Sequence, residues 1–332
     1  MIVVVGASAG GVESVSAFIN ALPADFGAAV LVVIHIPSHT PTQLDKVLAR
    51  HSRLPVRLAV DGGVVEPGHI YAPPTDRHLM LQGGVMRLTR GPKEGRVRPS
   101  IDVLFRSAAV EFGTRIIGVV MSGMLDDGTA GLWAIKDAGG KALVQCPDEA
   151  MHRSMPDSAI EHVQIDLIAP VAELAREVIK MVHQPAQAEP SCASTARHFV
   201  ENRIAMEGNG LQLGVMKLGQ VAGYTCPNCH GVLVQIEEGP IVRFRCHTGH
   251  SFSLKALLAE VNSSIDKGLW DTLRAVEERI MLLRQMAGLA HVAGHEQACR
   301  QWSNQAADAD QRIQALRELA LNGQLLGQLQ EE

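Results

Sequence analysis

Residues 2–11 read IVVVGASAGG, an unbroken apolar run that ends at Gly6 and passes through a glycine-rich turn into a helical pattern. Two further apolar runs, Ala29–Ile34 (AVLVVI) and Ile116–Met121 (IIGVVM), have the same character. Strands that are apolar on both faces are typical of a parallel sheet covered by helices on each side. Helical patterns lie at Gly10–Leu22, Gln43–Arg50, Val103–Phe112 and Gly131–Ala138. This alternation predicts a doubly wound, mostly parallel three-layer α/β domain over residues 1–183.

The composition excludes several classes of protein. The 332-residue chain is 46% hydrophobic and 20% charged, which is ordinary for a soluble globular protein of about two domains. A formal net charge of −5 argues against nucleic-acid binding, which is typical of proteins with a basic surface. The apolar run at the N-terminus has no basic flank and is too short for a signal peptide or a membrane span. We therefore expect a cytoplasmic protein that meets a membrane only indirectly, through a partner.

The second half of the chain has a different organisation. Residues 184–197 (QPAQAEPSCASTAR) are small, polar and proline residues without periodicity, which is typical of a linker. Apolar residues recur at helical spacing over residues 253–286, and Gly288 and Gly294 predict a break before a second helix. The two helices predict an antiparallel hairpin. The sequence thus predicts a linker and connector at residues 184–222, a small zinc-ribbon-like unit at residues 223–252 and the α-helical hairpin at residues 253–332.

Cysteine and histidine residues gather in the middle segment. A CPNC motif at residues 226–229 and a CxxxH motif at residues 246–250 are separated by sixteen residues, which suits a tetrahedral zinc site on two turns. Three thiolates and one imidazole leave no position for water, so zinc is expected to be structural, and no cofactor is expected for catalysis. His230 and His247 are alternative ligands, and reduced cysteines without metal are the other interpretation. The predicted ligands are Cys226, Cys229, Cys246 and His250.

The glycine-rich turn at residues 6–11 directly follows the first predicted strand, and three chemistries use such a turn. A dinucleotide-binding loop needs glycine where Ser8 stands, and an acidic residue where the second strand ends at His35. The nucleophile elbow G-x-S-x-G matches literally and exposes the serine hydroxyl. However, α/β-hydrolases order their triad as serine, acid and histidine, and they place strands before the elbow, whereas here the acidic loop comes last.

The third chemistry takes the partners of the serine from neighbouring strand ends. The carboxyl ends of parallel strands share one edge of the sheet, where ligands bind. Ser8, His35 and the acidic loop at residues 122–128 each follow a predicted strand. One crevice then holds a hydroxyl, an imidazole and a carboxylate, which are the groups that acyl transfer requires. The sequence thus predicts a serine hydrolase.

These motifs, taken in order, resemble the catalytic domain of the chemotaxis protein-glutamate methylesterase (CheB) family over the whole predicted α/β domain. The matching pieces are Gly6-Ala7-Ser8 with Gly10-Gly11, His35-Ile36-Pro37, Asp61-Gly62 with Pro67-Gly68, Tyr71-Ala72-Pro73, Arg98-Pro99-Ser100 with Asp102-Val103-Leu104-Phe105, Gly123-Met124 with Asp127-Gly128, and Met155-Pro156. The resemblance implies that Ser8 is the nucleophile, His35 the general base and Asp127 the orienting acid. It also implies that backbone N–H groups of Met124 and Ala9 bind the oxyanion.

Two positions depart from the family pattern. Many relatives carry threonine where this chain has Ala9, and asparagine where it has Asp126. The hydroxyl of that threonine is missing here, although a backbone N–H remains. Adjacent loop residues point in different directions, so only one of Asp126 and Asp127 is expected to reach His35, and the motif favours Asp127.

The resemblance implies hydrolysis of glutamyl γ-methyl esters on helical chemoreceptors through an acyl-enzyme, with release of methanol, and some relatives also deamidate glutamine. Familiar members carry a receiver domain before the catalytic domain, and because the first strand starts at Ile2, none is expected here. The apolar stripe of the C-terminal helices needs cover, which the hairpin itself, a dimer or a helical target would supply. Two other functions remain as alternatives: a non-catalytic adaptor that uses the esterase fold for docking, and a nucleotide-binding regulatory domain.

Overall fold

The computed structural model describes three stretches of the chain, residues 1–36, 42–184 and 195–322. The chain divides into two compact units, Met1–Leu257 and Leu258–Glu332. Most of the predicted linker at residues 184–197 lies outside the described residues. Within the described stretches, no helix combines the length and the apolar character that crossing a membrane would require.

A seven-stranded parallel sheet forms the centre of the first unit, in the order β3-β4-β2-β1-β7-β8-β9. The strands are β1 Ile2–Ala7, β2 Ala29–Ile34, β3 Val56–Leu58, β4 Ile70–Ala72, β7 Ile116–Val120, β8 Lys141–Gln145 and β9 Leu167–Ala169. Every residue of β1, β2 and β7 is buried, which explains why these three runs are apolar on both faces. The predicted doubly wound α/β fold is confirmed.

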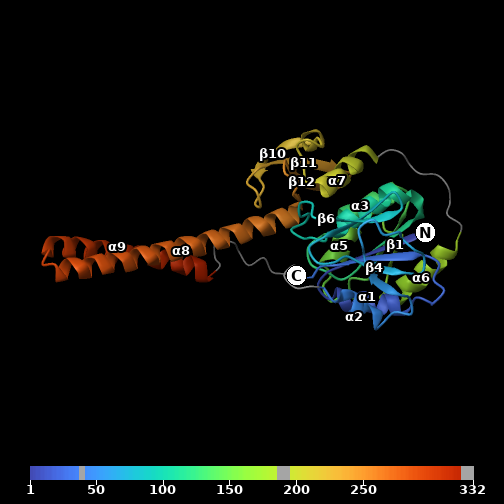
Figure 1. Cartoon of the computed structure of the whole chain (residues 1–332), viewed down its shortest axis with the longest axis horizontal. Helices are drawn as coiled ribbons and strands as arrows, with labels where there is room; N and C mark the ends of the chain where they lie inside the picture. Colours follow the sequence, from blue (N-terminus) through green and yellow to red (C-terminus); the bar gives the residue numbers. More distant parts are fainter. Residues whose placement is uncertain (37–41, 185–194, 323–332) are drawn as a thin grey trace. The chain divides into compact units, whose positions relative to one another are not determined.

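Helices cover both faces of this sheet (Figure 1). One layer contains α1 Gly11–Asn20, α2 Leu44–Ala49 and α6 Val171–His183, and the other contains α3 Ile101–Phe112, α4 Thr129–Asp137 and α5 Ser154–His162. Alternate residues of β1 point to opposite sides, so Val3 and Val5 pack with the first layer and Val4 with the second. The sheet therefore lies between two separate apolar cores.

Helices α3 and α4 each begin two residues before their predicted starts, because carboxylates cap their first turns. Asp127 accepts hydrogen bonds from the backbone N–H groups of Ile101 and Asp102 at the start of α3. Asp102 in turn accepts them from Gly128 and Gly131 at the start of α4. Each carboxylate binds amide donors that a helix end leaves without partners.

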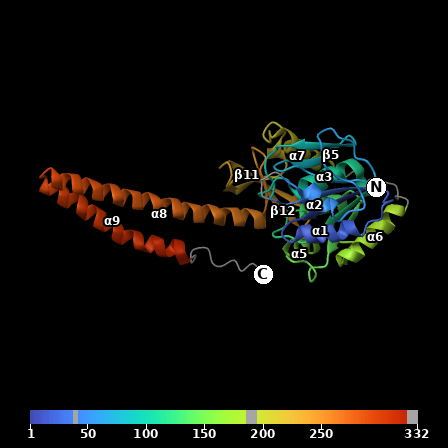
Figure 2. The ribbon, with the colours of Figure 1, turned by 60° about the horizontal axis from the view of Figure 1, so that its bottom comes forward.

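Beyond the central sheet, the first unit contains a β-hairpin, one helix and a small antiparallel sheet. The hairpin is formed by β5 His78–Gln82 and β6 Val85–Thr89. The antiparallel sheet, in the order β10-β11-β12-β13, comprises Gln220–Thr225, Val232–Glu238, Ile241–Cys246 and Ser251–Ser253. We call residues 220–253 the cysteine module. Residues 195–207, predicted as part of a connector, instead form helix α7, Thr195–Glu207, which lies beside α3 (Figure 2).

A buried network of charges joins α7 and the cysteine module to the central domain. Arg106 of α3 forms a bidentate ion pair with Glu94, and Arg245 of β12 also reaches Glu94 at 2.9 Å. Glu201 of α7 accepts hydrogen bonds from both Arg243 and Arg245. Separating any of these partners would leave a buried charge without compensation, which is costly. The network therefore favours the observed packing of α7 and the cysteine module on the central domain.

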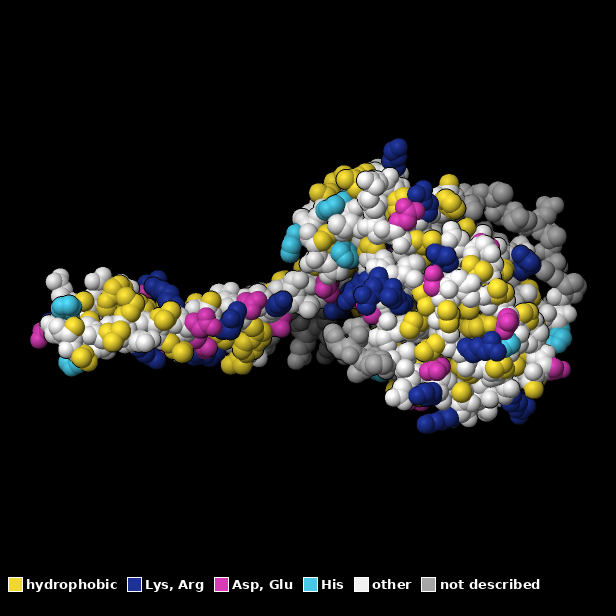
Figure 3. Space-filling view, in the orientation of Figure 1, with side chains coloured by type: hydrophobic (Ala, Val, Ile, Leu, Met, Phe, Trp, Pro, Cys, Tyr) yellow, Lys and Arg dark blue, Asp and Glu magenta, His cyan; other side chains and the backbone are white. Residues whose placement is uncertain are grey.

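The second unit is an antiparallel helical hairpin, as predicted, built from α8 Leu254–Val292 and α9 Glu296–Asn322. Its core is formed by the buried side chains of Leu273, Ile280, Leu283, Ala306, Ala309 and Ile313. The predicted break at Gly288 is wrong, since α8 continues through it at a cost of about 1 kcal/mol for a helical glycine. The helix ends near Gly294, whose φ of 73° suits a turn. Figure 3 shows apolar side chains at the hairpin surface. The exposed apolar residues of α8 include Trp270, Leu282 and Leu289.

Candidate active site

The three predicted catalytic residues meet at one edge of the central sheet. β1 lies between β2 and β7, and all three strands run parallel. Ser8 follows the end of β1, His35 follows the end of β2, and Asp127 belongs to the loop after β7. The sheet topology therefore brings a hydroxyl, an imidazole and a carboxylate together from positions up to 119 residues apart.

The turn at Ser8 is tight and fixed by its neighbours. The backbone N–H of Ser8 donates to the carbonyl of Ser122, and Gly11 N–H donates back to the carbonyl of Ser8. Gly10 has a φ of 69°, and a Cβ atom there would lie 2.7 Å from Met151 Cβ. Glycine is required at this position both for the left-handed backbone and for the close approach. The serine is thus held at the N-terminal end of α1.

His35 connects the serine to the acid. Its Nδ1 atom lies 3.1 Å from Ser8 Oγ, and its Nε2 atom lies 2.8 Å from Asp127 Oδ2. An ionised carboxylate only accepts hydrogen bonds, so Nε2 carries the proton and Nδ1 is left to accept from the Ser8 hydroxyl. The two ring nitrogens have exchanged the roles they play in chymotrypsin-type triads.

Asp127 is buried and bound from several directions. Besides His35, it accepts hydrogen bonds from Ser100 Oγ at 2.9 Å, Ile101 N at 2.7 Å and Asp102 N at 3.1 Å. Burial raises the pKa of this carboxyl, but the hydrogen bond and charge of His35, with the two backbone donors, lower it below its ordinary value overall. Asp127 is therefore ionised at neutral pH and oriented toward His35.

Ser100 is positioned by a second histidine, His78, which is fully buried. His78 accepts the backbone N–H of Ser100 on Nδ1, and its Nε2 faces the Pro92 carbonyl at 3.0 Å. Burial is the main cause that lowers the pKa of His78 to about 4, so the ring is neutral and can accept on one nitrogen while it donates from the other. The sequence analysis gave no role to His78 or Ser100, although Ser100 lies in one of the matching motifs and directly precedes a helix.

Asp126, the neighbour of the acid, points elsewhere. Its Oδ1 atom accepts a hydrogen bond from Ser253 Oγ at 2.8 Å, while Asp127 is the one that contacts His35. Burial raises the pKa of Asp126, and the hydrogen bond from Ser253 and the charge of Lys255 oppose this rise. The two adjacent carboxylates thus serve different partners.

The residues predicted to bind an oxyanion border the serine. Gly123 approaches Ser8 so closely that a Cβ on it would lie 2.8 Å from Ser8 Cβ. Met124 follows, and its side chain is partly exposed, while Leu125 holds a left-handed φ of 61°, unusual for a residue with a branched side chain. On the other side, the Ala9 carbonyl accepts a hydrogen bond from Ser122 Oγ at 2.8 Å, which fixes the peptide after Ala9. The structure therefore brings both predicted residues to the rim of the serine site.

The predicted zinc ligands converge in the cysteine module. The Sγ atoms of Cys226, Cys229 and Cys246 and a ring nitrogen of His250 all lie within 4.8 Å of one another. Measured separations are 3.6 Å between the sulfurs of Cys229 and Cys246, and 3.5 Å between Cys246 Sγ and His250 Nδ1. Tetrahedral zinc with Zn–S near 2.3 Å and Zn–N near 2.0 Å requires about 3.8 Å and about 3.5 Å for such edges. The four groups fit a zinc ion.

Neither of the two alternative histidines, His230 and His247, belongs to the group of converging ligand atoms found among the described residues. The ring of His247 packs over Gly231, where a Cβ atom would lie 2.0 Å from the ring. His250 is the histidine that the structure brings to the three sulfurs. Thr248 Oγ1 also contacts the cluster, at 2.9 Å from Cys246 Sγ. A hydroxyl at that distance supports a thiolate by hydrogen bonding, so the ligand set remains three sulfurs and one nitrogen.

Comparison with known proteins places the first half of the chain in a family. The sequence model of the CheB methylesterase family matches residues 3–178. The chain is 38% identical to protein-glutamate methylesterase/protein-glutamine glutaminase 1 of Geobacter metallireducens and 41% identical to the corresponding protein 2 of Anaeromyxobacter dehalogenans. These alignments cover 53% of this chain and 50% and 51% of the relatives, so the chain spans about half the length of the curated relatives it matches.

A solved structure has the same fold as this part of the chain. The CheB methylesterase catalytic domain of Thermotoga maritima is similar with a TM-score of 0.52 and 34% sequence identity. The match covers 54% of this chain and 97% of that one. Residues beyond the match to the family, including α7, the cysteine module and the hairpin, are the part for which the family gives no direct guide.

Proposed function

Since residues 3–178 show that this chain belongs to the CheB methylesterase family, we propose that it is a serine hydrolase that removes methyl groups from glutamyl γ-methyl esters. The observation that carries the proposal is the continuous hydrogen-bonded chain from Ser8 through His35 to Asp127. The names of the relatives, which are protein-glutamate methylesterases and protein-glutamine glutaminases, support the same substrate class.

The proposed acylation uses each member of this chain in turn. Ser8 Oγ attacks the ester carbonyl carbon while His35 Nδ1 takes the hydroxyl proton. Asp127 stabilises the imidazolium that forms, because it is ionised and bound to Nε2. The tetrahedral oxyanion is bound by the backbone N–H groups of Met124 and Ala9, next to the N-terminal end of α1. The C–O bond to the methoxy group then breaks, and His35 returns the proton to release methanol.

Water completes the reaction by attacking the glutamyl ester on Ser8. His35 Nδ1 takes a proton from this water, the bond from the acyl carbon to Ser8 Oγ breaks, and a free glutamate side chain and the serine hydroxyl are restored. A glutamine side chain would form the same acyl-enzyme with ammonia as the leaving group, so deamidation is proposed as a second activity of the same site.

The proposed substrate is a methylated helical receptor protein. The experiment that tests the proposal measures methanol released from membranes that contain a methylated receptor, and labelling of the protein by a fluorophosphonate. We expect Ser8→Ala to abolish labelling and to lower methanol release by at least about a thousandfold. Ser263→Ala, an exposed serine on α8, is the matched control and should behave like the wild type. If the wild type is neither labelled nor active, the adaptor alternative is favoured instead.

The cysteine cluster is proposed to hold one structural zinc ion. The support is the convergence of three sulfurs and one ring nitrogen at distances that suit a tetrahedron. Four protein ligands leave no open position, so this zinc would stabilise the module and take no part in ester hydrolysis. Metal analysis of protein purified under reducing conditions should find about one zinc per chain.

The C-terminal helices are proposed to contact the target or a second copy of the chain. Large apolar side chains remain exposed along α8, including Met281, Leu282 and Leu289. An exposed apolar surface on a helix is typical of a contact site. Comparing methanol release by the full chain and by a chain that ends at residue 257 would test target contact, and light scattering would test dimerisation.

A further inference from the structure

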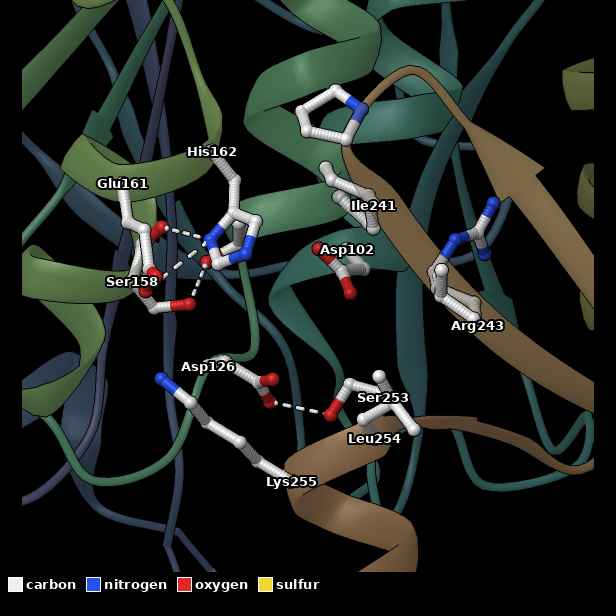
Figure 4. Close-up of a pocket in the computed structure, with 14 residues that line it drawn as sticks. Asp102, Asp126, Ser158, Glu161, His162, Ile241, Arg243, Ser253, Leu254 and Lys255 are labelled. Atoms are coloured by element: carbon white, nitrogen blue, oxygen red, sulfur yellow. Dashed lines mark hydrogen bonds and ion pairs between the residues drawn. The ribbon is translucent and has the colours of Figure 1, made fainter.

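The loop that carries the proposed catalytic acid is held from two sides. On the inner side, Asp127 binds His35, Ser100 and the start of α3. On the outer side, its neighbour Asp126 accepts the hydroxyl proton of Ser253 at 2.8 Å (Figure 4). Ser253 is the last residue of β13, and it therefore belongs to the cysteine module. The two sides of the acid loop are held by different parts of the first unit.

The hydroxyl of Ser253 is oriented for this contact. Its oxygen accepts the backbone N–H of Ala256 at 3.0 Å, in the first turn of α8. The hydroxyl therefore accepts from the helix cap on its oxygen and donates its single proton to Asp126, so it serves both partners at once. Figure 4 shows Lys255 on the other side of the same carboxylate. Asp126 is thus fixed between a neutral donor and a cation, at the edge of a cavity of about 190 Å³.

Strand β13 is also hydrogen-bonded to a second segment that lies beside Asp127. Ser251 N–H donates to the Lys93 carbonyl at 3.2 Å, and Gly95 N–H donates to the Ser251 carbonyl at 2.8 Å. Gly95 lies against the acid, since a Cβ on it would be 3.9 Å from the Asp127 side chain. This segment continues to Ser100, which binds Asp127 directly. One short strand therefore contacts the supports of the acid at two separate points.

The position of β13 is itself set by the cysteine module. Arg245 pairs with Ser251 and Arg243 pairs with Ser253 across β12 and β13. Both arginines are buried in the charge network with Glu201. His250, a member of the cysteine cluster, is bonded directly to Ser251 along the chain. Shifts in the module would be passed to the acid loop through these rigid contacts.

We propose that Ser253 is a positioning residue for Asp127, acting through Asp126, so that the cysteine module completes the active site. This inference rests on the proposed hydrolase function. It assigns to the second half of the chain a part in the reaction, in addition to any role in contacting the target. The contrasting interpretation is that Ser253 only caps α8, in which case its loss would alter stability and leave turnover unchanged.

A double-mutant cycle on the full chain separates these two interpretations. Ser253→Ala removes the donor, and Asp126→Ala removes the acceptor while it leaves the α8 cap intact. For hydrolysis of a small activated ester, each change should lower kcat about tenfold with little change in KM, because one aligning hydrogen bond is lost. The double variant should lose no more than either single variant, since both remove the same contact.

Two further variants provide the controls. Ser253→Thr keeps a hydroxyl at the same place and should restore most of kcat. Ser263→Ala, on the exposed surface of α8, should match the wild type in kcat and in Tm. The proposal is overturned if Asp126→Ala retains wild-type kcat, or if the losses of the two single variants multiply in the double variant. Asp126→Ala keeps this test decisive even where Ser253→Ala folds poorly.

Labelling by a fluorophosphonate distinguishes a failure of this proposal from a failure of the hydrolase function. If the wild type is labelled at Ser8 and hydrolyses the ester, the function stands, and the cycle alone decides the role of Ser253. If the wild type is neither labelled nor active, the hydrolase function is wrong, and the positioning role is overturned with it. Slower labelling of Ser253→Ala and Asp126→Ala by equal factors is the expected result.

Discussion

Replacing Asp127 with asparagine tests how the buried acid works, because the new side chain has almost the same shape. The carboxylate accepts four hydrogen bonds, two on each oxygen. An amide has one oxygen, which can keep the place of Oδ2 and the bonds from His35 and Ile101. Its NH₂ group then takes the place of Oδ1 and faces two former donors. The Ser100 hydroxyl can rotate and accept a hydrogen bond from the NH₂ group, whereas the backbone N–H of Asp102 can only donate and loses its acceptor. One buried N–H is left without a partner, at a cost of about 1–3 kcal/mol in the free energy of unfolding.

The catalytic loss should be much larger than this structural cost. Asparagine can preserve the position of His35, but it carries no charge to stabilise the imidazolium that forms when Ser8 gives up its proton. The same change in a serine protease lowers kcat about 10⁴-fold, and a loss of about 10³–10⁴-fold in kcat is expected here. KM should change little, because the acid does not touch the substrate.

The assay is hydrolysis of a small activated ester, with methanol release from methylated receptor as a second substrate and thermal unfolding as a measure of stability. Asp148→Asn, a highly exposed aspartate, is the matched control and should retain wild-type kcat. A loss of less than about tenfold in the Asp127→Asn variant, with the protein still folded, would refute the role of Asp127 as the orienting acid.

Three further outcomes are expected. Burial raises the pKa of Glu238, but the charge of Arg243 and the hydrogen bond of His198 outweigh it and lower this pKa to about 2. The ionised Glu238 therefore stabilises the fold above about pH 4.5, and this stabilisation is lost as the pH falls from about 4.5 to about 2. Glu238→Gln should flatten the pH dependence of the free energy of unfolding in that window, and an unchanged slope would contradict this. Cys226→Ser should release the bound zinc and lower kcat, while circular dichroism should show the central α/β domain still folded; retention of zinc would exclude Cys226 as a ligand. Ile280→Ala should destabilise the hairpin by about 2–4 kcal/mol, whereas the exposed Leu282→Ala should change its stability little, and equal effects would argue against the buried seam.

The central fold could be predicted because its strands are buried on both faces. Apolar runs such as Ile2–Val5 and Ala29–Ile34 are typical of strands buried on both faces, and the glycine-rich turn after β1 indicates where the site lies. The same rule of parallel sheets brought Ser8, His35 and Asp127 to one edge. Strand ends thus carry information about the site that is readable from the sequence.

Helix α7 could not be predicted, because the face that it buries is largely polar. His198, Glu201 and Asn202 are all buried, and they meet arginines and carboxylates from other elements. An apolar stripe at helical spacing is the usual signal for a buried helix, and here charge pairs replace part of it. The partners of such residues lie far away in the sequence, so neither spacing nor hydropathy identifies them.

The supports of the acid were missed for a related reason. Ser100 and His78 act on Asp127 through single hydrogen bonds between distant segments, and Ser253 contacts Asp126 across 127 residues. A serine before a helix predicts that its side chain caps the helix. Nothing in the sequence shows whether the same hydroxyl also donates a hydrogen bond to a neighbouring loop. Only the folded chain defines that second partner.

The charge on Asp126 links this loop to the cysteine module. Burial raises the pKa of this carboxyl, so an aspartate at this place is costly unless something compensates it. Ser253 and Lys255, both at the junction of the module and α8, provide that compensation by a hydrogen bond and a positive charge. Without the module, Asp126 would lose both partners, and the loop that carries Asp127 would lose its outer contact. Asp126 and the module that binds it are therefore one structural feature, and removal of either should be felt at His35.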